Sequence, residues 1–112
     1  MKLSLTWGWT MKKQAVVTAE ASRKAAAMLA ALGELDGASC WITLHNEYQC
    51  FFDDYADDGI ATLRRLRDEG KVISVNVREN PEAIALIPPE APEARRDFEN
   101  GVRIYILTKK GM

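Results

Sequence analysis

Five acidic residues with no base between them are the sharpest local feature of this chain. Clustered carboxylates can hold a hard cation such as Ca²⁺ through their oxygen atoms. A calcium loop of the EF-hand type that began at Asp54 would need oxygen ligands at Ala56 and Arg65, and neither side chain has an oxygen. The sequence therefore predicts a solvated loop that ends in a helix cap, and no metal site. The acids are Glu47, Asp53, Asp54, Asp57 and Asp58.

A second candidate for chemistry is the one histidine, His45, which lies near Cys50 in the sequence. Nucleophilic catalysis needs a base within hydrogen-bond reach of the nucleophile, and a third group that orients the base. The two residues could meet across a hairpin, with Glu47 or Asp53 as the orienting group. The chain has no second histidine and no glycine-rich phosphate loop. We therefore expect no catalytic site and no cofactor, and keep a small Cys/His enzyme as an alternative.

Aromatic side chains close to these acids favour a protein-binding surface. Exposed aromatic residues are enriched at protein interfaces, and clustered acids give a local negative field that steers association. We expect a protein partner with a basic surface, and an exposed edge strand would also suit a homodimer. The predicted partner-binding residues are Trp41, Glu47, Tyr48, Phe52, Asp53, Asp54, Tyr55, Asp57 and Asp58.

The basic residues are densest in one short stretch, where Arg64, Arg65, Arg67 and Lys71 are interleaved with two acids. This pattern is typical of a solvated helix with cations in its last turns, where the helix dipole favours them. The net charge of the chain is −1, and acids beside the aromatic residues would repel phosphate groups. The sequence therefore disfavours nucleic acid as the partner.

Hydrophobic periodicity predicts the elements that position these residues. Alternating apolar residues indicate strands, and apolar residues three and four apart indicate helices, two of which are expected to end at Gly33 and Gly70. The predicted elements are a strand over 3–9, a helix over 18–33, paired strands over 40–45 and 48–52, a helix over 57–70, a strand over 71–78, a short helical stretch and a strand over 102–108.

This order predicts an α+β fold, with a single domain over residues 1–112 and an antiparallel sheet that carries helices on one face. The order strand, helix, strand, strand, helix, strand resembles that of ferredoxin-like domains, with a C-terminal extension of a short helix and a strand. Many unrelated functions use that order, so the fold names none of them.

The composition is ordinary, with 47% apolar and 28% charged residues in 112. No apolar run approaches the roughly 20 residues that cross a bilayer, and two cysteines are too few for a disulfide framework. We expect a cytoplasmic location. The expected function is that of a non-enzymatic protein-binding domain, such as a small inhibitor or adaptor of bacterial or phage type. An alternative is a small-molecule regulatory domain, similar to the ACT type, at a dimer interface.

Overall fold

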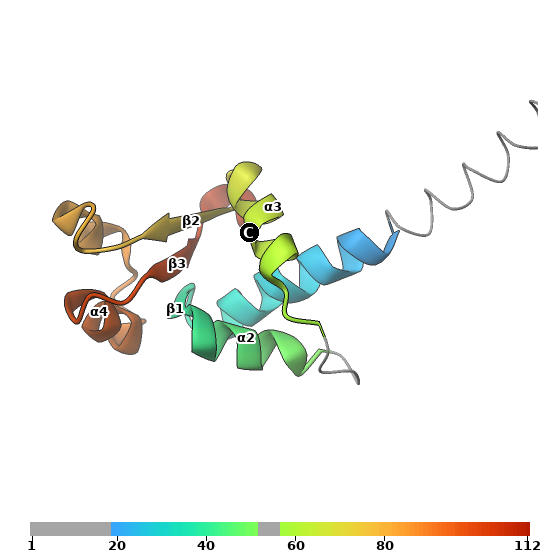
Figure 1. Ribbon diagram of the computed structural model, residues 1–112, viewed down its shortest axis with the longest axis horizontal. Helices are drawn as coiled ribbons and strands as arrows, with labels where there is room; N and C mark the ends of the chain where they lie inside the picture. Colours follow the sequence, from blue (N-terminus) through green and yellow to red (C-terminus); the bar gives the residue numbers. More distant parts are fainter. Residues whose placement is uncertain (1–18, 52–56) are drawn as a thin grey trace, which may run out of the picture.

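Three short strands form the sheet of this chain, whose computed structural model describes residues 19–51 and 57–112. The strands pair antiparallel in the order β1-β3-β2 (Figure 1). The predictions for residues 1–18 and 52–56, which include the strand over 3–9, lie outside the described residues. The strands are β1 (Ala38–Cys40), β2 (Val72–Val75) and β3 (Ile104–Leu107).

β3 takes the central place because both of its faces are apolar. Its two isoleucines alternate with Tyr105 and Leu107, and successive side chains of a strand point to opposite faces of the sheet. The isoleucines belong to one buried core, whereas Tyr105 and Leu107 pack against the other. In the register of the sheet, Tyr105 lies opposite Ser39 of β1 and Ser74 of β2.

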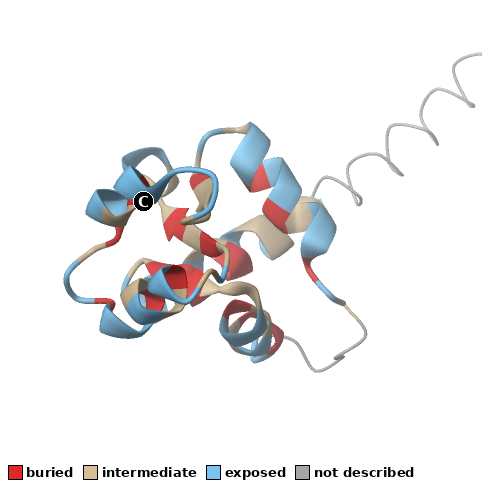
Figure 2. Cartoon of the chain, turned by 60° about the vertical axis from the view of Figure 1, so that its left-hand side comes forward, coloured by how far each residue is buried: buried red, intermediate tan, exposed pale blue. Residues whose placement is uncertain are grey.

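Three helices cover the face of the sheet that carries Tyr105. They are a helix over residues 19–34, α2 (Trp41–Gln49) and α3 (Ile60–Asp68). Their buried residues gather on the sides that face inward (Figure 2). This core is formed by Ala27, Met28, Ala31, Leu32, Leu44, Tyr48, Leu63, Leu66 and Val72.

The opposite face of the sheet is covered by the segment between β2 and β3. That segment contains a 3-10 helix, η1 (Pro81–Leu86), and α4 (Pro92–Glu99), and a last 3-10 turn, η2 (Lys109–Gly111), follows β3. Helical segments therefore cover both faces, whereas the sequence predicted helices on one face. The second core consists of Ala38, Ala83, Ile87, Ala91, Ala94, Phe98, Ile104 and Ile106.

The predicted strand pair over 40–45 and 48–52 is wrong, because residues 41–49 form α2 and β1 ends at Cys40. Leu44 and Tyr48 are four residues apart, which places them on one helix face. Both are buried in the core that the 19–34 helix shares. A short apolar segment is compatible with a period of two and with a period of 3.6, so packing against the rest of the chain decides its structure.

Three other predicted elements are confirmed with shorter bounds, whereas the helix predicted over 18–33 continues through residue 34, so its expected end at Gly33 is wrong. The helix over 57–70 is α3, and the strands over 71–78 and 102–108 are β2 and β3. The mixed helix and strand class with an antiparallel sheet is therefore confirmed. The ferredoxin-like order is not confirmed, because the described residues contain three strands.

Candidate functional site

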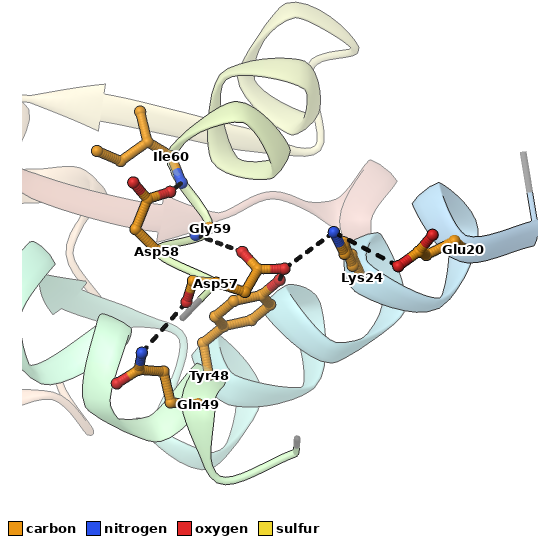
Figure 3. A network of polar contacts seen from close by, with 8 residues as sticks. All are labelled: Glu20, Lys24, Tyr48, Gln49, Asp57, Asp58, Gly59 and Ile60. Atoms are coloured by element: carbon orange, nitrogen blue, oxygen red, sulfur yellow. Dashed lines mark hydrogen bonds and ion pairs between the residues drawn. The ribbon is translucent and has the colours of Figure 1, made fainter. Parts of the chain in front are cut away.

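Asp57, one of the predicted partner-binding acids, makes contacts that link three helices (Figure 3). Its Oδ2 atom accepts a hydrogen bond of 3.2 Å from the Tyr48 hydroxyl of α2 and lies 3.0 Å from Nζ of Lys24 in the 19–34 helix. Its Oδ1 atom accepts a hydrogen bond of 2.8 Å from the backbone N–H of Gly59, directly before α3. The side chain of Asp57 therefore has structural contacts on both oxygens.

The ionisation of this network follows from the same contacts. Burial acts to raise the pKa of Asp57, but the hydrogen bonds from Lys24, Gly59 and Tyr48 outweigh burial and lower it. Burial, together with the charge of Asp57, raises the pKa of Tyr48 to about 12. The hydrogen bond to Asp57 raises the pKa of Lys24. At neutral pH the network is therefore an ion pair with a neutral phenol donor.

Asp58 contributes to the same helix start. Its Oδ1 atom accepts a hydrogen bond of 3.1 Å from the backbone N–H of Ile60 (Figure 3). Early N–H groups of a helix have no partner within the helix, and negative charge is favourable there. The N-cap of α3 is Gly59, which has no side-chain cap hydrogen bond, so the predicted aspartate cap is wrong in position. Asp57 and Asp58 bind the N–H groups of Gly59 and Ile60, where the chain enters α3.

The predicted aromatic sheet face is not formed by Trp41 and Tyr48, because both lie on α2. Tyr48 has an exposed fraction of 0%, so its side chain offers no area to a partner. Trp41 is half-buried and stacks on His45, with ring centroids 5.1 Å apart. Glu47 is half-buried, and a hydrogen bond shared with Glu34 raises its pKa. Phe52, Asp53, Asp54 and Tyr55 lie outside the described residues.

The pairing of His45 with Cys50 across a hairpin is wrong, because α2 replaces that hairpin. The Cys50 thiol donates a hydrogen bond to the carbonyl oxygen of Asn46, one helical turn earlier. The Nε2 atom of His45 is buried and has no hydrogen-bond partner in the described part of the chain. Within residues 19–51 and 57–112, no three His, Cys, Asp or Glu side chains lie close enough to hold a metal ion.

A groove that the sequence did not reveal lies between α3 and the sheet. Its volume is about 450 Å³, and its lining combines three arginines with two aromatic rings and contains no acid. Arg64 and Arg67 come from α3, and Arg103 directly precedes β3. The lining residues are Trp41, Ile60, Leu63, Arg64, Arg67, Ser74, Arg103 and Tyr105.

The three arginines differ in how they are held. Arg103 donates a hydrogen bond of 2.9 Å to the hydroxyl of Ser74 and forms an ion pair with Glu79. Its hydrogen bond to Glu79 raises the pKa of Arg103. Arg67 is 3.7 Å from the exposed carboxylate of Asp68. Arg64 is exposed and has no ion-pair partner among the described residues. The guanidinium group of Arg103 is therefore held in place, whereas those of Arg64 and Arg67 can change position to contact a ligand.

A second cavity has the opposite charge. It lies between the end of the 19–34 helix, β1 and the start of α4, and has a volume of about 340 Å³. Its lining contains five acids and no base, so the described surface separates negative from positive charge. The acids are Glu34, Asp36, Glu90, Glu93 and Asp97.

The arginines of α3 were visible in the sequence, but their partner across the groove was not. Arg103 enters the groove because β3 pairs with β2, with Tyr105 opposite Ser74. Only that long-range pairing brings residue 103 next to α3. Hydrophobic alternation over 102–108 was the signal for the strand, and it carried no information about the neighbour of that strand.

Comparisons with known proteins found no relative: no family model matches the chain, and neither a curated protein nor a solved structure is significantly similar. No helix of the described residues has the length and apolar character needed to cross a membrane.

Proposed function

We propose that this chain is a non-enzymatic DNA-binding domain that contacts a duplex with α3 and the adjacent groove. The observation that carries the proposal is the meeting of Arg64, Arg67 and Arg103 at one groove without an acid in its lining. Arginine binds phosphate through a planar fork of N–H donors. Two such groups on α3 and one beside β3 are suited to contact successive phosphates of a DNA strand.

The order of elements supports the same proposal. Apart from η1, α4 and η2, the described chain runs helix, strand, helix, helix, strand, strand, with the last strand between the other two. This order resembles that of winged helix-turn-helix domains, in which the helix at the position of α3 enters the major groove of DNA. The chain departs from that pattern where η1 and α4 are inserted between β2 and β3. The likeness is an analogy of fold, so the charges must carry the functional argument.

The exposed side of α3 suits a nucleic-acid surface. Ala61, Arg64, Arg65 and Arg67 are exposed there, and an α-helix fits the width of the major groove. The net charge of −1 does not oppose binding at this place, since charges more than about 10 Å away are screened at 0.1 M salt. The local charge of the groove therefore matters more than the total.

The test is the binding of a short, fluorescein-labelled DNA duplex, followed by fluorescence anisotropy at two salt concentrations. Three phosphate contacts predict that the logarithm of the binding constant falls with that of the salt concentration with a slope of about −2.7. Between about 50 and 200 mM salt, this slope corresponds to a loss of roughly 40-fold in affinity. Absence of binding at the lower salt concentration would contradict the proposal.

A matched pair of variants distinguishes binding at this groove from non-specific electrostatic attraction between the protein and DNA. Arg64→Ala removes one groove charge, and Arg96→Ala removes an exposed arginine of α4 on the other side of the sheet. Arg64→Ala should weaken binding and reduce the salt slope by about 1, whereas Arg96→Ala should leave both nearly unchanged. Equal losses in the two variants would place the contact elsewhere.

A second candidate is the protein partner expected from the acidic segment. Within that segment, which runs from Glu47 to Asp58, Phe51 has an exposed fraction of 43% and Asp58 is exposed. An exposed aromatic ring is typical of surfaces that bind protein partners. Reversal of Asp53 and Asp54 to lysine should weaken binding to a basic protein captured from the native host. Unchanged binding at two salt concentrations would remove this candidate. The dimeric regulatory domain stays a prediction that size-exclusion chromatography with light scattering can check.

A further inference from the structure

We propose that the groove beside α3 takes one unpaired nucleotide of the bound DNA, with its base against the aromatic lining and its phosphate against the arginines. This inference rests on the proposed DNA binding and deepens it, because it names the structural class of DNA. The site would recognise a junction between duplex and single strand.

The aromatic lining has a geometry that can receive a base. Trp41 and Tyr105 both line the groove and meet edge to face, with ring centroids 6.4 Å apart and an interplanar angle of 69°. His45 stacks on Trp41 at an interplanar angle of 21°, so it holds the indole ring and occupies one of its faces. A base would stack against the part of the Trp41 and Tyr105 rings that lines the groove.

The polar lining matches the other half of a nucleotide. Arg64 and Arg67 approach the groove from α3, and Arg103 approaches it from the sheet. The Ser74 hydroxyl accepts a hydrogen bond from Arg103, and its own proton stays available for a phosphate or base oxygen. The volume of about 450 Å³ lies within the range of about 300–1,000 Å³ of small-ligand sites.

An intact duplex cannot use this lining fully. Bases within a duplex are stacked on each other and present their edges to the grooves. An unpaired base exposes its face, and proteins that bind single strands stack such faces on aromatic side chains between cationic groups. The combination of rings and arginines in one groove therefore favours a nucleotide outside the stack.

Three DNA probes test this inference with the full-length chain. They are a blunt duplex, the same duplex with a short single-stranded thymine extension, and the same duplex with an abasic extension of equal length. The abasic probe has the same charge as the thymine probe and lacks only the bases. Trp7→Phe and Trp9→Phe leave Trp41 as the one tryptophan of the three in the chain, so tryptophan emission then reports on the groove.

We expect the thymine extension to bind roughly 5- to 150-fold more tightly than the abasic extension, which is the range for one base stacked on an aromatic side chain. We also expect only the thymine extension to quench the emission of Trp41. Trp41→Ala, checked for folding by circular dichroism, should remove the difference in affinity between the thymine and abasic extensions.

Equal affinities for the thymine and abasic extensions, with unchanged Trp41 emission, would overturn the nucleotide site. Binding of the blunt duplex in that case would leave the proposed DNA-binding function intact. Failure of all three probes to bind would overturn both. The two proposals therefore fail through different results.

Discussion

The Lys24 ammonium lies 3.0 Å from Oδ2 of Asp57, although the two residues are 33 positions apart in the chain. This ion pair links the 19–34 helix to the start of α3, and the Tyr48 hydroxyl adds a hydrogen bond from α2 to the same oxygen. The exposed fractions of the Lys24 and Asp57 side chains are 32% and 25%. The pair is therefore partly shielded from water, and it contributes more than a fully exposed pair would.

Replacement of Asp57 by alanine should destabilise the fold. The change removes the acceptor for Lys24, Tyr48 and the Gly59 N–H at once. A hydrogen bond to a charged group contributes about 1.5–3 kcal/mol to stability. Because Asp57 is partly exposed, the combined contribution of its three contacts is smaller than the sum of these values. We expect a loss of about 2 kcal/mol in the free energy of unfolding, measured with urea. Asp68→Ala is the control, since Asp68 is 73% exposed. Equal effects of the two changes would contradict the structural role of Asp57.

The lowered pKa of Asp57 predicts a loss of stability in acid. A carboxyl group whose pKa is lower in the folded state contributes stability above its unfolded pKa of about 4, and this contribution disappears as the pH falls through the folded value. The free energy of unfolding of the wild type should therefore decrease in acid more steeply than that of Asp57→Asn. Urea titrations at several pH values below about 5 measure both curves. Parallel curves would show that Asp57 ionises alike in both states.

Gly59 should not tolerate a side chain. Its φ angle is +70°, and an added Cβ would lie 2.8 Å from both Cε of Met28 and Cε2 of Tyr48. The left-handed conformation costs an ordinary residue about 1–2 kcal/mol, and overpacking of a core costs about 1–3 kcal/mol more. We expect Gly59→Ala to lower the free energy of unfolding by about 2–4 kcal/mol.

Gly33 offers the matched control for that change. It lies in the 19–34 helix, and nothing would lie within 4 Å of an added Cβ. Gly33→Ala should therefore stabilise the chain by up to about 1 kcal/mol, because alanine favours a helix over glycine. The two substitutions should shift the melting temperature in opposite directions. A shift of the same sign in both would contradict the geometry at Gly59.

Much of the secondary structure could be predicted from local patterns. The helix that becomes α3 has apolar residues at 60, 63 and 66 and ends before a glycine, and β3 is a short apolar run in which buried and half-buried residues alternate. Residues 41–49 could not be assigned in this way, because nine residues with apolar groups at many positions match either period. The helix is selected by burial of Leu44 and Tyr48 in a core that begins at residue 27, which no local pattern contains.

The candidate site shows the same limit. The sequence predicts that the arginines of α3 form a solvated helix face, and they are exposed. It also places Trp41 in a strand, whereas Trp41 begins α2. The groove requires α2, α3, β2 and β3 to meet, and β3 joins the others through contacts between residues far apart in the sequence. The net charge of −1 likewise gives no sign that the described residues form a basic groove and an acidic cavity.

Glu47→Gln should stabilise the chain at neutral pH. The hydrogen bond to Glu34 is the largest cause of the raised pKa of Glu47, and burial is the second. A raised folded pKa means that stability is greatest at low pH, where the proton is bound, and falls as the pH rises through the folded value. A neutral amide at this position can donate to Glu34 at any pH. We expect a higher melting temperature for the variant at pH 7 and a smaller difference near pH 4. A difference that grows in acid would contradict this pairing.

Glu79→Gln should strengthen DNA binding through Arg103. Glu79 forms an ion pair with Arg103, and its side chain is 62% exposed, so it competes with a phosphate for the same guanidinium group. Loss of this charge should raise the affinity for duplex DNA by roughly threefold to tenfold and make the salt slope steeper. The cost in folding stability should stay below about 1 kcal/mol, as for other exposed ion pairs. Arg103 keeps its position through Ser74.

Glu99→Gln supplies the control for the change at Glu79, because it removes the same charge from an exposed position on α4, on the other side of the sheet. Its affinity for the duplex should equal that of the wild type, measured by anisotropy at the same two salt concentrations. A gain of equal size in both variants would assign the effect to net charge. No gain in either would show that Arg103 does not contact phosphate, and the interface would then be limited to the arginines of α3.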